Sequence, residues 1–189
     1  MTNQPFPVYN NRTDVLQFGK VHMTNAWIPP ERLQAIRSHM HGRDAIITDI
    51  LLETGFRIDD IMHMRKCNLS GRSVRLREKK TGHDRSAILS PETAARIAEY
   101  AAKRHTLAYL FPALRRAKRK KQHRTTYWRH FEEACKRSGY GDCGYTPHSL
   151  RKVYAVRMFR ETGSLTAVQK DLGHTNISTT AIYALSDRL

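Results

Sequence analysis

The chain has 189 residues, of which 33 are Lys or Arg and only 17 are Asp or Glu, giving a formal net charge of +16 and an isoelectric point near 10.2. Hydrophobic residues make up 40% of the sequence, enough to bury the core of one folded domain. A basic excess of this size repels itself unless a polyanion shares the surface, so nucleic acid is the expected partner. Charge alone also fits a basic protein that binds no polyanion.

Cysteine usage and hydropathy exclude several other classes. The three cysteines (Cys67, Cys135 and Cys143) are an odd number without a CxxC pair, which argues against a disulfide framework and against a zinc ribbon. No apolar run reaches the roughly 18 residues of a membrane span, and the first 20 residues contain none of signal-peptide length. We therefore expect a cytoplasmic protein without membrane contact.

Residues 1–26 are polar and aperiodic and are expected to form a flexible arm. The remainder, 27–189, is expected to form one mainly helical domain with a small antiparallel β-sheet. Two strands are predicted from alternation, 73–77 and 85–89, joined by a basic connection. The first predicted helix begins at Pro29 and is broken at Gly42; a second helix ends near Gly55, and a short third helix covers 56–64. A fourth begins at Ser90. Further helices are predicted from Thr125 to Gly139, from Thr146 to about 162, from Leu165 to Leu172 and from Ile177 to Leu185.

A basic run follows Leu114 in a predicted loop. Its members are Arg115, Arg116, Lys118, Arg119, Lys120, Lys121 and Arg124. A charge run of this kind is usually a solvated loop, and beside a DNA site it is equally suited to contact phosphates.

Two segments place arginines near helix starts. In Thr54-Gly55-Phe56-Arg57, an arginine follows a glycine break and begins a helix, a pattern that alone is typical of a surface residue. In the segment 146–152, Thr146 is the expected N-cap, with His148 in the first turn and Arg151 three residues later on the same face. Because a helix N-terminus attracts anions, this arrangement suits a phosphate cradle, although taken alone the segment slightly favours a capped, exposed basic helix start.

The third segment, 171–183, ends one helix at Gly173 and exposes His174 at the break. Tyr183 follows nine residues later on the next helix. Taken singly, such a histidine is more often a cap or a packed side chain, and such a tyrosine more often belongs to the core.

Together these segments resemble the tyrosine recombinase (phage integrase) family, whose catalytic fold is shared with type IB topoisomerases. The matches, in the family's order, are Thr54-Gly55-Phe56-Arg57, a weaker Lys80-Thr81-Gly82 followed by Arg85, His148-x-x-Arg151, and Leu172-Gly173-His174 with Tyr183. The resemblance implies a site-specific recombinase that cuts and rejoins DNA through a 3′-phosphotyrosine formed by Tyr183.

The chemistry suits these residue types. Arg57 and Arg151 present forked donors that match two phosphate oxygens and stay charged. The resemblance implies that His174 adds a hydrogen bond to the same oxygens and that His148 orients the phosphate or moves the tyrosine proton. Tyr183 is a weak nucleophile, and we expect the surrounding positive charge to favour its phenolate form.

The leaving 5′ oxygen needs a proton. Lys80 resembles the family's general acid because it directly precedes Thr81-Gly82, and Lys79 is the competing candidate. No carboxylate cluster of metal-site type and no P-loop accompany these groups, so neither a metal nor another cofactor is expected.

The sequence departs from the family pattern in two places. Lys152 stands where relatives often carry histidine after the second arginine; it keeps the positive charge and is expected to contact DNA. Relatives commonly place a DNA-clamping domain of about 80 or more residues before the catalytic one, whereas about 26 precede it here, and only six residues follow Tyr183. The chain is therefore expected to be either a fragment of a longer integrase or a stand-alone catalytic domain.

The expected partners are double-stranded DNA, three further copies of the chain in a tetramer on two duplexes, and accessory DNA-bending proteins. A type IB topoisomerase activity and a non-catalytic DNA-binding regulator that keeps the fold are the alternatives. The motifs encode neither the target sequence nor the choice among integration, excision, inversion and resolution.

Overall fold

A computed structural model describes residues 25–79, 82–103, 109–113 and 121–188. Its helices are α1 (Pro30–Ser38), α2 (Gly42–Thr54), α3 (Ile58–Met62), α4 (Pro91–Ala102), α5 (Arg124–Arg137), α6 (Pro147–Thr162), α7 (Leu165–Leu172) and α8 (Ile177–Ala184). The strands β1 (Leu69–Ser70), β2 (Ser73–Arg77) and β3 (Asp84–Ile88) form an antiparallel sheet in that order, preceded by a 3₁₀ turn at Lys66–Asn68. The predicted class, mainly helical with a small antiparallel sheet, is confirmed.

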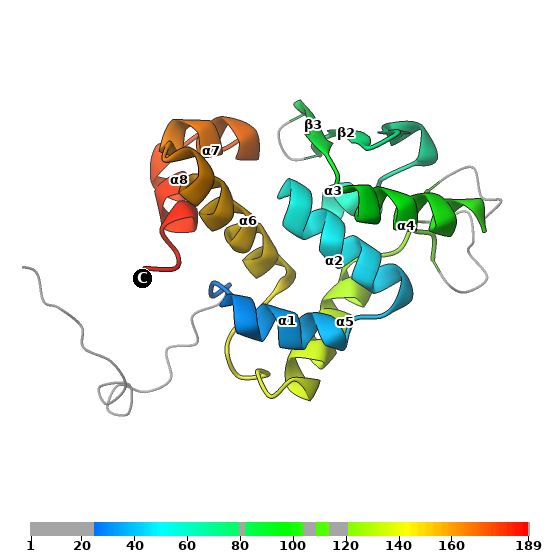
Figure 1. The fold of residues 1–189 in the computed structure, drawn as a ribbon, viewed down its shortest axis with the longest axis horizontal. Helices are drawn as coiled ribbons and strands as arrows, with labels where there is room; N and C mark the ends of the chain where they lie inside the picture. The colour runs from blue at the N-terminus through cyan, green and yellow to red at the C-terminus, as the bar shows by residue number, and fades with distance from the viewer. Residues whose placement is uncertain (1–24, 80–81, 104–108, 114–120, 189) are drawn as a thin grey trace, which may run out of the picture.

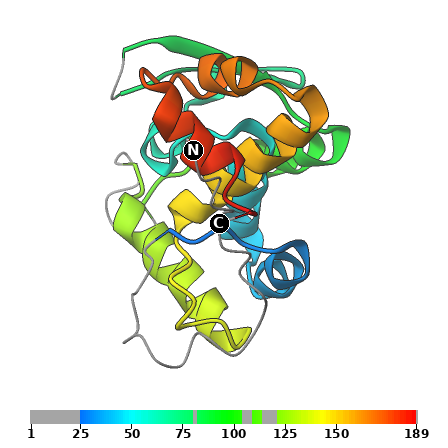
Figure 2. The ribbon, with the colours of Figure 1, turned by 90° about the vertical axis from the view of Figure 1, so that its left-hand side faces the viewer.

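Helix α2 lies at the centre of the molecule. Its sequence is apolar around most of its circumference, and nine of its 13 residues are buried, as expected for a core helix. It packs against α6 on one side and α4 on the other, while α1 packs against α5 (Figure 1). Figure 2 shows the sheet and α7 at one end of the molecule and α5 at the other.

Apolar side chains form two separate clusters. The main core extends from Ile28 to Leu150 and includes α2, the sheet and α5. A smaller cluster of Ala155, Val168, Leu172 and Ala184 holds α6, α7 and α8 together, and the ring of Tyr183 packs on it. The three C-terminal helices therefore form a compact subassembly on the side of α2.

Local boundaries differ from the expected ones at several points. Helix α2 begins at Gly42, which was predicted to precede it, and α3 is shorter than predicted, leaving Arg57 in an extended conformation just before the helix. The strand β1 was not predicted, because two residues are too few to show alternation. Asp84, expected in the connection, pairs with Arg77 in the β2–β3 ladder.

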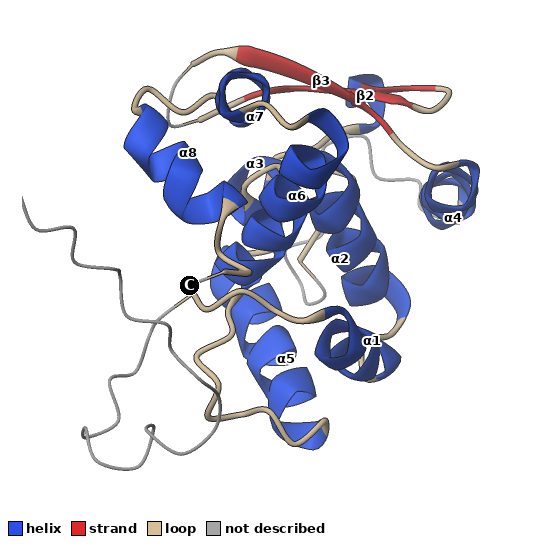
Figure 3. Ribbon diagram, turned by 60° about the vertical axis from the view of Figure 1, so that its left-hand side comes forward, coloured by secondary structure: helices blue, strands red, loops and turns tan. Residues whose placement is uncertain are grey.

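The hairpin ends next to the C-terminal helices. The amide of Glu78 donates to the carbonyl of His83, and the amide of Gly82 donates to the carbonyl of Glu78, both at 2.8 Å, which closes the connection between β2 and β3. Figure 3 shows these strands at the same end of the molecule as α7. Within the described ranges, no helix is both long and apolar enough to cross a bilayer.

Candidate active site

Arg57 lies in the short link between α2 and α3. Gly55 ends α2 with a left-handed φ of 60°, and a Cβ at this position would collide with the ring of Tyr154 on α6. The conformation and the close approach both require glycine. Arg57 then occupies the N-cap position of α3, and its Nη1 forms an ion pair with Oε2 of Glu78 at 2.7 Å.

The amino end of α6 carries His148 and Arg151. The hydroxyl of Thr146 accepts a hydrogen bond from the amide of His148, and the hydroxyl of Ser149 accepts one from the amide of Thr146, both at 3.1 Å. Pro147 occupies the first helical position, where no N–H is needed. The predicted cap is confirmed, and it sets His148 in the first turn of the helix.

Arg151 is buried, with 1% of its surface exposed. Its guanidinium donates to the carbonyl of Gly55 and, at 2.5 Å, to that of Leu172, so it joins α6 to the ends of α2 and α7. Its Nη2 also lies 3.4 Å from Nε2 of His174. Its buried Nε finds no acceptor among the described residues, which leaves a donor that a bound anion could satisfy.

Tyr183 lies between two imidazoles. Its hydroxyl contacts Nε2 of His148, and its ring meets both histidines edge-on, with centroid distances of 5.4 Å to His148 and 5.2 Å to His174. His174 directly follows Gly173, which ends α7, and its Nδ1 lies 3.1 Å from the hydroxyl of Thr180, a buried residue of α8. A hydroxyl can donate or accept, so Thr180 supports either tautomer of the ring.

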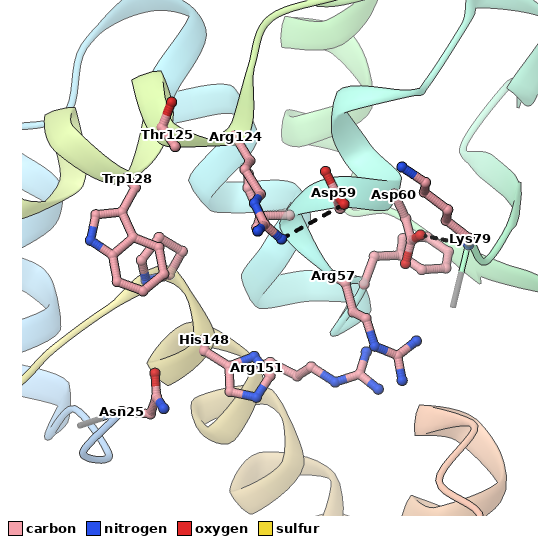
Figure 4. A pocket seen from close by; sticks show the side chains of 13 residues that line it. Asn25, Arg57, Asp59, Asp60, Lys79, Arg124, Thr125, Trp128, His148 and Arg151 are labelled. Carbon is pink, nitrogen blue, oxygen red and sulfur yellow. Dashed lines mark hydrogen bonds and ion pairs between the residues drawn. The ribbon is translucent and has the colours of Figure 1, made fainter. Parts of the chain in front are cut away.

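Five predicted residues thus come together in one place: Arg57, His148, Arg151, His174 and Tyr183. The first three of them line a cavity of about 710 Å³. Figure 4 shows the guanidinium groups of Arg57 and Arg151 converging at one side of this cavity, with His148 nearby. Segments far apart in the sequence therefore form a single cationic site.

Burial and neighbouring charges alter the acidity of the site. Burial, with added repulsion from Arg57 and Arg85, lowers the pKa of Arg151 to about 9, so the side chain is still charged at neutral pH. Burial and then the positive charge of Arg151 lower the pKa of His174 to about 4, so its ring is neutral at pH 7. His174 is therefore a hydrogen-bonding group at neutral pH, without a charge of its own.

The expectation that the surrounding positive charge favours the phenolate form of Tyr183 is only partly right. Arg151 and Arg57 do lower the pKa of the phenol, but burial acts more strongly in the opposite direction, and the net result is a raised pKa. The sequence reveals the cations that lower this pKa but not the burial of the ring that raises it. Without DNA the phenol keeps its proton, and its hydroxyl lies against His148.

Two buried carboxylates belong to the site and were not predicted. Glu78 is 1% exposed and contacts both Arg57 and Arg85. Asp60 is 3% exposed and accepts a hydrogen bond from the amide of Lys79 at 3.0 Å, and burial raises its pKa. The sequence did offer a signal for them: Asp60 closely follows Arg57, and Glu78 directly precedes the lysines of the hairpin, in a chain with few acidic residues.

The lysines of the hairpin are only partly described. Lys80 lies outside the described residues, so its role as general acid remains a prediction. Lys79, the competing candidate, is exposed and lines the cavity, where Figure 4 shows its backbone held by Asp60. Arg85, in contrast, is buried behind the site and donates to Glu78, Asp171 and the carbonyl of Thr54.

The basic run is also only partly described. Arg115, Arg116, Lys118, Arg119 and Lys120 lie outside the described residues. Lys121 is half-buried and forms an isolated bridge with Pro112. Arg124 begins α5, is exposed, lines the cavity, and places its Nη1 3.8 Å from Oδ2 of Asp59 (Figure 4). Of the two members of the run that the structure describes, Arg124 lies beside the candidate site.

Two further side chains flank this cationic site. Lys152 is half-buried with its Nζ 5.7 Å from the centroid of the Tyr183 ring, and burial lowers its pKa. It lies beside the tyrosine ring, and its contact with DNA stays a prediction. Trp128 on α5 was not predicted as a site residue; it is 43% exposed and lines the cavity together with Arg124.

Among the described residues, no three His, Cys, Asp or Glu side chains are grouped closely enough to hold a metal ion. The carboxylates nearest the site, Glu78 and Asp60, instead contact a guanidinium and a backbone amide.

The sequence matches a known family and several curated relatives. Residues 26–188 match the sequence profile of the phage integrase family. The chain is 30% identical over 144 residues to tyrosine recombinase XerA of Pyrococcus furiosus, covering 75% of this chain and 49% of the relative. It is 28% identical over 165 residues to the TnP I resolvase of Bacillus thuringiensis, covering 83% and 55%. The chain thus spans about half the length of these relatives.

Solved structures show the same fold. A crystal structure of XerA recombinase superposes with a TM-score of 0.72 at 22% identity, covering 85% of this chain and 60% of the other. A lambda integrase fragment, solved as a dimer bound to a COC′ core site, gives 0.68 at 18% identity, covering 84% and 59%. The profile match over nearly the whole chain shows that it belongs to the phage integrase family of tyrosine recombinases.

Proposed function

We propose that this chain is the catalytic domain, over residues 27–189, of a site-specific recombinase that cuts and rejoins double-stranded DNA through a 3′-phosphotyrosine at Tyr183. The observation that carries the proposal is the position of the Tyr183 hydroxyl against His148, in a site shared with two arginines. The XerA relative and the lambda integrase structure, whose crystal contains a DNA core site, support it.

In the first step, the scissile phosphate binds to Arg57 and Arg151. Each guanidinium has further donors beyond its protein contacts, including the unpartnered Nε of Arg151. His174, being neutral, donates from Nε2 to the phosphate while Thr180 donates to its Nδ1. These groups stabilise the charge that builds up on the equatorial oxygens during the attack.

In the second step, the Tyr183 oxygen attacks phosphorus and the bond to the 5′ oxygen breaks. Because the phenol is protonated in the free protein, its proton must leave during the attack, and His148 is the base that its hydroxyl contacts. Lys80 donates a proton to the departing 5′ oxygen. The reverse reaction, with a 5′-hydroxyl of another strand, restores the phosphodiester, so the sequence of steps uses neither water nor ATP and needs no metal.

The proposal extends to the surroundings of the site. DNA passes over the cavity, where Arg124, Trp128 and the basic run contact the strand that flanks the scissile phosphate, together with Lys152. Four copies act on two duplexes in the cytoplasm, with accessory DNA-bending proteins at some sites. Residues 1–24 of the expected arm lie outside the described residues, whereas its last two, Asn25 and Ala26, donate their amides to the carbonyl of Gly144 at 3.0 and 3.4 Å.

Covalent trapping tests the central claim. Nicked duplexes tiled across the DNA that flanks the encoding gene are incubated with the protein. Denaturing gels reveal a protein–DNA adduct because the short fragment that carries the new 5′-hydroxyl diffuses away and cannot be rejoined. We expect an adduct with the wild type and none with Tyr183→Phe, whose DNA affinity stays within about twofold because only one hydroxyl is lost.

The other outcomes separate the alternatives. DNA binding without any adduct identifies a non-catalytic regulator. Relaxation of supercoiled plasmid with no preference among the tiled duplexes identifies a type IB topoisomerase activity. An adduct formed by Tyr183→Phe excludes Tyr183 as the nucleophile.

A further inference from the structure

Glu78 occupies a junction between the hairpin and the phosphate site. Its backbone closes the β2–β3 connection through His83 and Gly82, and its side chain is fully buried. A buried carboxylate is stable only when charged or polar partners compensate for the loss of water. The identity of those partners therefore indicates what the residue does.

The two carboxylate oxygens of Glu78 contact different arginines. Oε1 accepts a hydrogen bond from Arg85 Nη1 at 3.2 Å, and Oε2 lies 2.7 Å from Arg57 Nη1. Arg85 is held in turn by Asp171 and by the carbonyl of Thr54, and it does not line the cavity. Glu78 therefore connects a structural arginine behind the site to an arginine that lines the cavity.

The turn that ends α7 closes over the same carboxylate. Gly173 has a φ of 61°, and a Cβ built on it would lie 3.3 Å from Oε2 of Glu78. His174 is the next residue. Glu78 thus lies where the arginine link, the hairpin and the histidine turn meet, although the three are far apart in the sequence.

The contact with Glu78 also limits how Arg57 can bind a phosphate. A guanidinium has five N–H donors arranged as a fork. When Nη1 faces Glu78, the Nε and Nη2 donors stay available for the two oxygens of a phosphate. Arg57 is 20% exposed through the cavity, so this edge is accessible from the DNA side.

Charge balance points the same way. Arg57, Arg85 and Arg151 lie close enough for the first two to lower the pKa of the third, and Glu78 opposes that effect. Two buried guanidiniums and a third that is 20% exposed repel one another unless an anion lies between them. Before DNA arrives, Glu78 is the carboxylate that contacts two of the three.

We propose that Glu78 is a positioning residue for recombination: it fixes the guanidinium of Arg57 for the scissile phosphate and keeps the arginines together in the absence of DNA. The inference rests on the proposed function. It assigns Glu78 no contact with the DNA itself, so its effect is exerted through Arg57.

A double-mutant cycle tests this assignment on the nicked duplex that the wild type cleaves. We expect Glu78→Gln to slow adduct formation about 100-fold, comparable to the loss of one donor to a transition-state oxygen, with DNA affinity within about threefold. In an Arg57→Lys background the same change should cost less than about threefold, because Glu78 acts through Arg57. The matched control is Asp49→Asn, at a buried carboxylate that also binds two arginines, Arg37 and Arg96, outside the site; it should cleave at the wild-type rate.

Several outcomes would overturn the assignment. A wild-type rate for Glu78→Gln, losses that multiply in the double variant, or equal slowing by Asp49→Asn each contradict it. If Glu78→Gln does not fold, Glu78→Asp keeps the charge and withdraws it from Arg57 by one methylene; slower cleavage supports the assignment, and an unchanged rate overturns it. A wild type that forms no adduct on any duplex instead overturns the proposed function, and the inference with it.

Discussion

Glu78 and Asp49 are both buried carboxylates that bind two arginines, and they lie in different parts of the molecule. The arginines at Glu78 are themselves mostly buried, with 20% of the Arg57 side chain and 9% of the Arg85 side chain exposed. Those at Asp49 are half in water, with 49% exposed for Arg37 and 44% for Arg96.

The difference in solvent changes what the same contacts achieve. Water screens the pairs at Asp49, and exposed pairs of this kind contribute about 0–1 kcal/mol to stability. At Glu78 little water competes, so the guanidinium positions are held firmly, and removing one partner leaves a buried charge uncompensated. The guanidinium positions are therefore held more firmly at Glu78, where both partners of each pair are mostly buried, than at Asp49, where only the carboxylate is buried.

The largest expected effect comes from exchanging arginine for lysine at each carboxylate. Arg57→Lys keeps the charge and loses the fork, so we expect adduct formation to slow by about 10²–10³-fold. Arg96→Lys should leave the rate unchanged and alter the free energy of unfolding by less than about 1 kcal/mol. Single-turnover cleavage and urea denaturation of both variants measure this, and equal slowing by the two would remove the distinction between the clusters.

A smaller effect is expected at the edge of the cavity that faces DNA. Trp128→Ala should raise the Kd for a cleavable duplex about tenfold at every salt concentration, because an exposed aromatic ring that packs on a nucleotide contributes about 1–3 kcal/mol.

Alanine at Lys118, Arg119, Lys120 and Lys121 should instead flatten the dependence of DNA affinity on salt concentration, since phosphate contacts release counterions. A salt titration of both variants distinguishes the two contributions. If the basic-run variant keeps the wild-type slope of affinity against salt concentration, the run does not contact phosphates.

A last expected effect concerns acid stability and not DNA. The pKa of His174 is about 4 in the folded protein against an ordinary 6.5, so the unfolded chain takes up a proton first as the pH falls. His174 therefore lowers stability progressively between about pH 6.5 and pH 4, and this loss is absent above that range. His174→Gln should give a shallower fall in Tm across the same window, with little change at pH 8. An identical pH dependence in the two proteins would show that burial among the arginines does not control this histidine.

Much of the fold could be predicted because it depends on local chemistry. Ser90 and Thr146 accept hydrogen bonds from backbone amides in the first turn of the helices that were predicted to begin at these residues. Gly55 and Gly173 end helices in the left-handed conformation. Each of these features needs only a few consecutive residues, so a single sequence is sufficient to identify them.

The predicted site residues were found through spacing and resemblance, and their meeting in space was an inference from family order. The structure brings five of them together through contacts that no short segment contains. Arg151 binds carbonyls at the ends of α2 and α7, and the Tyr183 hydroxyl contacts His148, 35 residues earlier. Such contacts depend on helix packing around α2, which periodicity predicts only in outline.

The sequence by itself determined the helical class, the caps and the set of cationic and phenolic groups available for phosphate chemistry. Only the tertiary structure decided that Glu78 lies between Arg57 and Arg85, that Trp128 borders the cavity, and that burial outweighs positive charge in setting the pKa of Tyr183. The physical reason is that desolvation and long-range charge interactions depend on what surrounds a group in three dimensions, and residues distant along the chain supply those surroundings.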